Sequence, residues 1–392
     1  MSAADHRCIM LSAGEASGDL HGATMCRALR ALDPAVRLIG MGGPRMAAAG
    51  VEILVDPTAQ AAVGTSEALG HVPALYRAYK ILVERLRNAR PLAIVLIDFP
   101  EFNLRLARHA RRAGIPVVYF IPPQLWAWRR GRIRQMARRV TLVLAAFPFE
   151  KDLYEGAGVP VEFVGHPLLD VVPRDLDRAK ARERLGVGEG RIVVGLLPGS
   201  REHEVSRLLP HMLDAAARLA VDGRRCFVLG LAASVEREQV TALLGRAAKA
   251  GGPPVEVVKG LTYEVMAGAD VLLIASGTAT LEAALLGAPM VVCYRVSRLT
   301  ELMARVLKRS PWISLPNIIA GRGAVPEILQ DDVTGARLAS EAEHLLVDPA
   351  AAPAQRAAFK ELGSRLGKPG VGERAARAVL KVAGAAKMVG TQ

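Results

Sequence analysis

Cysteine is scarce in this chain, and the few cysteines are far apart. The 392 residues include four, Cys8, Cys26, Cys226 and Cys293, with no CxxC pair among them. Disulfide frameworks and zinc sites both need closely spaced cysteines, so neither is expected here. Free cysteines of this kind fit a reducing cytosol.

Aromatic residues and long apolar runs are also few. Aromatic side chains make up only 4% of the sequence, and no RNA-recognition, zinc-finger or basic-zipper pattern is found, which argues against nucleic acid as a partner. The apolar run near the N-terminus, Cys8 to Ser12, is too short for a signal peptide. No run approaches the roughly 18 apolar residues that a membrane span needs. We expect a soluble or peripheral protein.

Signatures of metal and covalent catalysis are missing as well. The chain has no GxSxG, no HExxH and no cysteine beside a histidine. Asp175-Leu176-Asp177 matches the DxD of metal-dependent sugar transferases, but it lies in a polar stretch between two arginines, where a helix N-terminus is the better interpretation. We therefore expect no metal and no cofactor, and catalysis by positioning, one base and charge stabilisation.

Positive charge is abundant. The formal net charge is +13, which indicates an anionic partner such as nucleic acid, a membrane surface or phosphorylated small molecules. Six arginines fall between Arg129 and Arg139, although a solvated basic helix explains such a run by itself. Residues 68–86 combine helical apolar spacing with arginines and a lysine. That pattern predicts a core-facing helix first and a membrane-resting surface second.

Apolar runs alternate with helical stretches in both halves of the chain, which predicts an α/β protein with parallel sheets covered on both faces. The strands expected in the first half are 8–11, 37–40, 92–97, 117–121, 142–144 and 161–164, and those in the second are 192–197, 226–229, 255–258, 271–274 and 290–294. Ligands of such sheets bind at the carboxyl ends of the strands.

A polar, proline-bearing stretch separates the two halves. We expect a first domain at 1–168, a linker at 169–190, a second domain at 191–340 and Ala-rich closing helices at 341–392. Two wound domains joined in this way leave a cleft between the carboxyl edges of their sheets, where a donor and an acceptor could meet.

The strand at 192–197 runs into Pro198-Gly199-Ser200-Arg201 and then into a helical pattern. Free backbone N–H groups at a helix start, with a Ser hydroxyl and an Arg fork beside them, suit a phosphate or diphosphate. No Gly-Lys-Ser/Thr follows, so this is not a Walker loop. The alternative is a tight turn with a surface arginine.

A second loop of this kind follows the strand at 271–274. Ser276, Gly277 and Thr278 open a helix there, and Glu282 lies one turn further on. The hydroxyls can bind a phosphate and the carboxylate can accept from ribose hydroxyls, although an ordinary Ser/Thr N-cap explains most of the pattern equally well. Two such loops on adjacent strand ends favour a bound nucleotide diphosphate.

The first strand ends in a polar, glycine-rich loop that contains Glu15 and Ser17. Gly18 and Gly22 share one helix face and allow close approach of a ligand or a strand. The alternative is close helix-to-sheet packing, with Asp19 or Ser17 as the N-cap. The spacing is not GxGxxG, so it gives little support to a dinucleotide cofactor.

Asp98 follows the strand at 92–97. A carboxylate at that position could remove a proton from an attacking hydroxyl. Asp98 and Glu101, three residues apart around Pro100, also match a capping box for the next helix. The two roles can coexist.

These loops, in this order, resemble the lipid-A-disaccharide synthase family, glycosyltransferases with two Rossmann-like domains facing across a cleft (the GT-B type). The matching segments are SAGEASGDLHGA (12–23), GMGGPRM (40–46), IDFPEFN (97–103), PPQLWAWR (122–129), FVGHPLLD (163–170), LLPGSREHE (196–204), ASGTATLE (275–282), SLPN (314–317) and VPEILQ (325–330). They span most of the chain.

The resemblance implies an inverting transfer of diacylglucosamine from UDP to diacylglucosamine 1-phosphate, which yields a β-1,6 disaccharide and UDP. It implies Asp98 as the general base, with Arg201 and Ser200 at the departing diphosphate. Glu282 would contact the ribose. Asn317 and Glu327 would make further donor contacts, and Glu15 and Ser17 would line the acceptor side.

The same resemblance implies a cytoplasmic enzyme attached peripherally to the inner face of the inner membrane. The arginines after Trp128 would face an acceptor phosphate or anionic lipid headgroups. No nucleic-acid partner is expected, and a homodimer is left open. Two alternatives remain: a UDP-sugar 2-epimerase of the same fold, and a basic nucleic-acid- or membrane-binding protein with a vestigial nucleotide fold.

Overall fold

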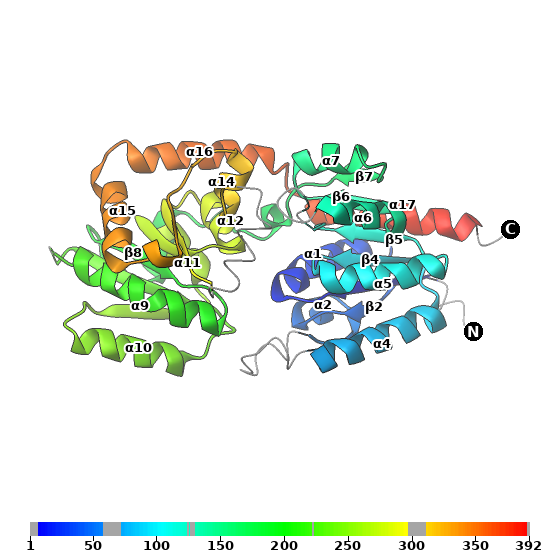
Figure 1. The fold of residues 1–392 in the computed structure, drawn as a ribbon, viewed down its shortest axis with the longest axis horizontal. Helices are drawn as coiled ribbons and strands as arrows, with labels where there is room; N and C mark the ends of the chain where they lie inside the picture. Colours follow the sequence, from blue (N-terminus) through cyan, green and yellow to red (C-terminus); the bar gives the residue numbers. More distant parts are fainter. Residues whose placement is uncertain are drawn as a thin grey trace. The chain divides into compact units, whose positions relative to one another are not determined.

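The computed structural model describes residues 7–57, 72–123, 125, 130–221, 223–296 and 311–389. The chain divides into two compact units, each built on its own parallel sheet (Figure 1). The first unit comprises Met1–Val171 together with Arg365–Gln392, and the second comprises Val172–Ser364.

The first unit contains a seven-stranded sheet in the order β3-β2-β1-β4-β5-β6-β7, and its strand pairs are parallel. Its strands are β1 (Cys8–Ala13), β2 (Arg37–Met41), β3 (Val51–Val55), β4 (Ala93–Ile97), β5 (Val117–Phe120), β6 (Leu142–Ala145) and β7 (Val161–Phe163). Every residue of β1 and β4 is buried, as expected of central strands covered on both faces.

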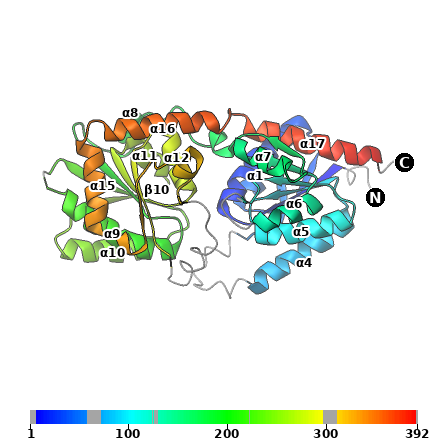
Figure 2. The same cartoon turned by 45° about the horizontal axis from the view of Figure 1, so that its top comes forward.

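Helices lie along both faces of this sheet. They are α1 (Ala16–Leu32), α2 (Pro44–Ala48), α4 (Val72–Ala89), α5 (Pro100–Arg112), α6 (Ile133–Arg139), α7 (Pro148–Glu155) and α17 (Val371–Val389), with short 3₁₀ turns η2 (Arg130–Arg132) and η3 (Pro167–Asp170). Helices α4, α5 and α6 lie side by side in both views of the chain (Figures 1 and 2), while α1 packs against α17.

The C-terminal helix α17 returns to the first unit. The carboxylate of Asp170 accepts hydrogen bonds from the amides of Gly370 (2.6 Å) and Gly372 (2.8 Å) at its start. Arg374 Nε donates to the carbonyl of Val164 at 2.9 Å. The sequence grouped 341–392 as one set of closing helices, whereas these contacts tie the last helix to the first sheet.

The second unit contains a six-stranded parallel sheet in the order β10-β9-β8-β11-β12-β13. Its strands are β8 (Ile192–Leu197), β9 (Arg225–Leu231), β10 (Val255–Lys259), β11 (Val271–Ala275), β12 (Met290–Tyr294) and β13 (Glu327–Leu329). Its helices are α8 (Arg178–Arg184), α9 (Glu202–Leu219), α10 (Arg237–Lys249), α11 (Thr262–Gly268), α12 (Thr278–Leu285), α14 (Leu315–Ala320), α15 (Gly335–Val347) and α16 (Ala351–Arg365), with the 3₁₀ turn η4 (Gln330–Asp332).

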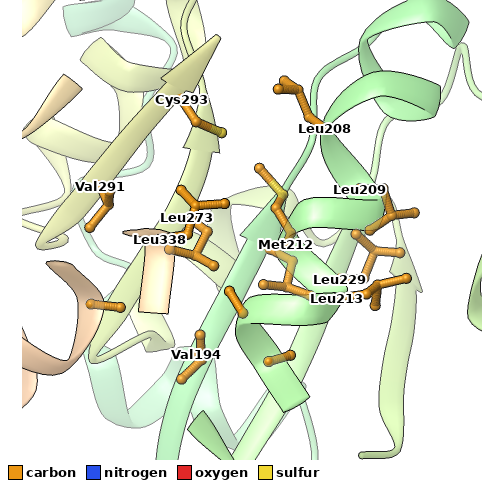
Figure 3. Packing of buried hydrophobic residues seen from close by; sticks show 14 of the residues in the cluster. Val194, Leu208, Leu209, Met212, Leu213, Leu229, Leu273, Val291, Cys293 and Leu338 are labelled. Atoms are coloured by element: carbon orange, nitrogen blue, oxygen red, sulfur yellow. The ribbon is translucent and has the colours of Figure 1, made fainter. Parts of the chain in front are cut away.

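One core of the second unit forms where α9 and α15 cover a face of this sheet (Figure 3). Leu208 and Met212 of α9 are fully buried against Val194 and Leu273 of the strands, and Leu338 joins them from α15. The apolar positions of α9 recur at helical spacing, so one stripe of the helix faces the sheet.

The expected α/β fold with two wound parallel sheets is confirmed. Two edge strands were not predicted from the sequence. Strand β13 has only three residues and β3 is half-exposed along most of its length, so neither shows the apolar run of a buried strand. The stretch read as a linker, 169–190, also contains helix α8, which is anchored by Arg182 and Arg178 to Asp270.

Helix α4 corresponds to the helix that was expected at 68–86. Residues 68–71 of the expected helix lie outside the described part. Ala78, Leu82, Val83 and Leu86 are buried, in agreement with a core-facing helix. Tyr76, whose position fits the same helical apolar spacing, is 57% exposed. Within the described residues no helix is long and apolar enough to cross a bilayer.

Candidate active site

In the first unit, two of the predicted polar loops lie next to each other. Strands β1 and β4 are neighbours at the centre of the sheet, and Ala13 is paired with Ile97 at their carboxyl ends. The loop that contains Glu15 and the turn that contains Asp98 therefore leave the sheet side by side. Gly14 is required there because a side-chain Cβ would approach the ring of Phe99 to 2.2 Å.

The backbone at Asp98 is unusual. Asp98 and Phe99 have φ angles of 47° and 48°, in the left-handed region. The carbonyl oxygen of Asp98 accepts hydrogen bonds from the hydroxyl of Tyr119 (2.8 Å) and from Nδ2 of Asn103 (2.7 Å). Strained backbone of this kind concentrates at functional sites, where surrounding contacts hold it.

Asp98 is partly buried and poorly solvated. Burial, followed by the charge of Glu15, raises the pKa of Asp98 from 3.8 to about 6, although the amide of Phe99 acts in the opposite direction. Glu15 is exposed at the N-cap position of α1. A carboxyl group with a pKa near 6 can take up a proton near neutral pH, which is what a general base requires.

The capping-box interpretation of Asp98 is wrong. The N-cap of α5 is Phe99, and no side chain caps this helix. Glu101, the other member of the expected box, forms an ion pair with Arg132 instead. The carboxyl group of Asp98 is therefore not used to cap the helix.

The glycines of the first loop serve packing. A Cβ at Gly22 would meet the Met46 sulfur at 2.7 Å, and one at Gly18 would meet the Cβ of Ala13 at 3.3 Å. Asp19 does not cap its own helix, as one interpretation expected: it accepts from the amides of Gly43, Arg45 and Met46 and so holds the start of α2. Ser17 does not cap α1 either, because the N-cap is Glu15, and Ser17 is half-buried beside it.

The arginine-rich segment lies only partly within the described residues. Trp126, Trp128 and Arg129 fall outside them. Arg139 donates to the carbonyl of Leu104 at 3.0 Å, and Arg132 pairs with Glu101, so these two arginines hold α6 and its preceding turn against α5 instead of being fully solvated.

In the second unit, the two predicted anion loops are also neighbours. Strand β8 pairs with β11, with Leu197 opposite Ile274 at their carboxyl ends. Ser200 and Arg201 follow the first of these strands, and Ser276, Gly277 and Thr278 follow the second. The sequence correctly placed both loops at one edge of the sheet.

Two backbone amides in the loop after β8 already donate hydrogen bonds to a side chain of the protein. Glu204 Oε2 accepts from the amides of Ser200 (3.0 Å) and Arg201 (3.3 Å), so these two donors are not the open phosphate cradle that was expected. Gly199 has a φ of +117°, and a Cβ there would meet Glu204 Oε2 at 2.4 Å. The Arg201 side chain remains 56% exposed, with Nη1 at 3.4 Å from Glu204 Oε1.

The loop after β11 is more open. The N-cap of α12 is Gly277, without a side-chain cap, and both Gly277 and Thr278 are exposed. The alternative interpretation, an ordinary Ser/Thr N-cap, is therefore wrong, and Ser276 Oγ donates to the carbonyl of Ile313 at 3.2 Å. An uncapped helix start favours an anion. Half-buried Glu282, one turn on, accepts from the hydroxyl of Tyr263 at 2.8 Å.

Asn317 and Glu327 meet each other beside this region. The fully buried amide of Asn317 donates to Glu327 Oε1 (2.8 Å) and to the Val325 carbonyl (2.9 Å), and accepts from the amides of Ala324 and Val325. These bonds use its full hydrogen-bonding capacity, which leaves none for the expected donor contact.

Glu327 also accepts hydrogen bonds within the protein, three on Oε1 and one on Oε2, and its expected donor contact stays a prediction. Its carboxylate also accepts from the amides of Ile313 (2.9 Å) and Ser314 (2.9 Å) and from the Ser314 hydroxyl (2.7 Å). The pair therefore fixes the segment that accepts from Ser276 and starts α14, which makes both side chains structural supports of this edge.

Comparison with known sequences decides the family. A sequence model described as lipid-A-disaccharide synthetase matches residues 9–380. The lipid-A-disaccharide synthase of Geobacter sulfurreducens is 45% identical over 380 residues, covering 97% of this chain and 98% of that protein. That of Myxococcus xanthus is 40% identical over 375 residues, covering 95% and 97%. The chain belongs to the lipid-A-disaccharide synthase family. It is therefore a glycosyltransferase of lipid A biosynthesis, and neither the epimerase nor the nucleic-acid alternative is favoured.

Solved structures show the fold that this synthase family shares with other enzymes. The calicheamicin glycosyltransferase CalG4 superposes with a TM-score of 0.61 at 17% identity, over 96% of this chain and 98% of that one. The UDP-GlcNAc 2-epimerase of Neisseria meningitidis gives 0.57 at 12% identity, over 95% and 98%. The two-domain GT-B fold is thus confirmed, whereas identities this low carry no argument about substrate.

Several residues around the synthase's candidate site were missed by the sequence reading. Asn103 and Tyr119 hold the Asp98 turn, and Glu204 and Tyr263 contact Arg201 and Glu282. Glu204 had a recognisable signal, because a Glu three residues after a helix N-cap is typical of a capping box, and Asn103 ends the segment IDFPEFN (97–103). Tyr119 and Tyr263 reach the site from β5 and α11, far from the predicted loops in sequence, which a linear motif does not show.

Proposed function

We propose that Asp98 is the general base of an inverting transfer in which the chain joins UDP-2,3-diacylglucosamine to 2,3-diacylglucosamine 1-phosphate. Asp98 takes the proton of the acceptor 6-hydroxyl as its oxygen bonds to the anomeric carbon. The bond from that carbon to the UDP oxygen breaks, and its electron pair leaves with the diphosphate. The products are lipid A disaccharide 1-phosphate, with a β-1,6 linkage, and UDP.

The observation that carries this proposal is that Asp98 combines a raised pKa with a carboxyl group that caps no helix. It ends a central strand, its pKa lies at about 6, and it is free of the helix-capping role that would otherwise explain it. Glu15 and Ser17 follow the adjacent strand, so they are suited to contact the acceptor sugar.

For the second unit we propose binding of the UDP part of the donor. The uncapped start of α12, with exposed Gly277 and Thr278, offers amide and hydroxyl donors to a phosphate. Arg201 and Ser200 on the neighbouring loop would stabilise the charge that develops on the leaving diphosphate; a hydrogen bond to a charged group contributes about 1.5–3 kcal/mol. Glu282 would accept from a ribose hydroxyl.

A direct test follows UDP release and product mass with both substrates, with and without acceptor, and in the presence of a chelator. We expect acceptor-dependent UDP release and a disaccharide 1-phosphate, unaffected by chelation. Asp98→Asn and Arg201→Ala should remove turnover while the fold survives. Normal turnover in either variant would refute the role given to that residue. Donor consumption without acceptor would indicate epimerase- or hydrolase-type chemistry.

We also propose that helices α4, α5 and α6 of the first unit rest on an anionic membrane surface. Arginines gather along them: Arg87, Arg108 and Arg112 lower the pKa of His109, after its burial, and Arg108 and Arg138 act likewise on Arg139. On α4, Tyr76 and Ile81 are 57% and 44% exposed. Exposed apolar side chains beside a basic face are suited to the interface of an anionic bilayer.

The membrane proposal can be tested with a matched control. Tyr76→Ser with Ile81→Ser should reduce sedimentation with anionic phospholipid vesicles, and so should added salt, because salt screens headgroup attraction. Val221→Ser with Val347→Ser removes apolar side chains of the second unit that are even more exposed, 77% and 66%, and should leave sedimentation unchanged. Equal losses in both pairs would contradict the proposal.

A further inference from the structure

We infer that Tyr119 and Asn103 are positioning residues that aim the carboxylate of Asp98, an inference that rests on the proposed role of Asp98 as the base. Both side chains donate to one atom, the carbonyl oxygen of Asp98, at 2.8 Å and 2.7 Å. They act on the backbone of Asp98, so the carboxylate itself stays available to the acceptor hydroxyl.

The turn needs such support. Asp98 and Phe99 are consecutive left-handed residues, and although Asp tolerates this conformation, a bulky residue such as Phe rarely adopts it. The two hydrogen bonds fix the plane of the peptide that joins Asp98 to Phe99. They thereby fix the direction in which the Asp98 side chain leaves the end of the strand. Without them the left-handed turn loses the contacts that maintain it.

Asn103 links this turn to its neighbours. Its side chain is fully buried, and Nδ2 also lies within 3.2 Å of the Ile97 carbonyl and 3.3 Å of the Ser12 carbonyl. Oδ1 accepts from the Ser12 hydroxyl at 2.7 Å, which fixes the orientation of the amide. Tyr119, also fully buried, reaches Asp98 from β5. Asp98 is thereby held to β1 and β5 as well as to its own strand.

The chain offers a matched control for Tyr119. Tyr154 is equally buried, and its hydroxyl also donates to a backbone carbonyl in the first unit, that of Pro123 at 3.1 Å. Tyr119→Phe and Tyr154→Phe therefore each remove one buried tyrosine hydroxyl bond, but only the first of these bonds reaches Asp98.

The experiment measures kcat, the KM for each substrate and the unfolding temperature of both variants. We expect Tyr119→Phe to lower kcat by about 10- to 100-fold with both KM values unchanged, since a small misplacement of a reacting group slows chemistry without weakening binding. Tyr154→Phe should lower the unfolding temperature to a similar extent and keep kcat within about threefold of the wild type. Ser12→Ala, which frees the Asn103 amide, should lower kcat in the same direction by less.

The outcomes separate this inference from the function on which it rests. If Asp98→Asn is inactive but Tyr119→Phe matches Tyr154→Phe in kcat, Tyr119 is structural only and the inference is overturned while the base assignment stands. If Asp98→Asn turns over normally, the base assignment fails first and the inference fails with it. A selective kcat loss in Tyr119→Phe, beside an inactive Asp98→Asn, supports both.

Discussion

Asp98→Asn should make this enzyme more stable at neutral pH while it removes activity. The folded protein keeps a partly buried carboxylate whose pKa is raised to about 6 from an ordinary 3.8. That difference of about two pH units corresponds to about 3 kcal/mol lost by keeping Asp98 ionised in the folded state. Asparagine removes the charge at nearly constant volume, tolerates the left-handed φ of 47° and still accepts from the Phe99 amide.

The sign depends on pH. For a carboxyl group with a raised folded pKa, stability is greatest below the unfolded pKa near 4 and falls as pH rises towards 6. We therefore expect the variant to exceed the wild type by about 2–3 kcal/mol at pH 7, and by nearly nothing at pH 4. For a unit of this size, the difference at pH 7 corresponds to an increase of roughly 5–10 °C in unfolding temperature.

The assay is thermal unfolding at pH 7 and pH 4, with UDP release measured on the same preparations. Asp152→Asn serves as the control, since it makes the same substitution at an exposed position of α7 and should change neither quantity. The reasoning is refuted if Asp98→Asn is no more stable than wild type at pH 7, or if its advantage persists at pH 4.

Three further predictions concern neighbouring contacts. Glu15→Gln removes a charge that raises the pKa of Asp98. The fall of kcat/KM on the acid side of the pH profile should therefore move to lower pH. An unchanged profile would show that Glu15 does not influence the pKa of the base. Glu327→Gln disrupts a carboxylate that accepts from Ile313, Ser314 and Asn317, and should cost the second unit about 2–3 kcal/mol and weaken UDP binding, as measured by urea unfolding and by calorimetric titration; undiminished stability would contradict the supporting role. Asp170→Asn weakens the acceptor of the Gly370 and Gly372 amides and should cost about 1–2 kcal/mol and speed proteolysis just before α17, whereas unchanged cleavage would show that the helix is held by packing alone.

The sequence by itself determined the architecture and the locations of the polar loops. Apolar runs such as 192–197 and 271–274 predict parallel strands directly, because strands covered on both faces are apolar throughout, and the structure has strands β8 and β11 there. Parallel strands end at one edge, and the two anion-suited loops of the second half were predicted on adjacent strand ends, which the pairing of β8 with β11 confirms for Ser200 and Ser276. That Glu15 lies beside Asp98 follows only from the pairing of β1 with β4 in the structure. The edge strands β3 and β13 lack such runs and were missed.

Only the tertiary structure decided what each polar side chain does. The side chains of Glu204, Asn317 and Glu327 form hydrogen bonds with other parts of the protein. Asp19 caps the neighbouring helix α2 instead of its own. The pKa of Asp98 is set by burial and by Glu15, and its turn is held by Tyr119 from another strand. Hydrogen-bond partners and solvation depend on distances between segments far apart in the chain, which a linear pattern does not contain.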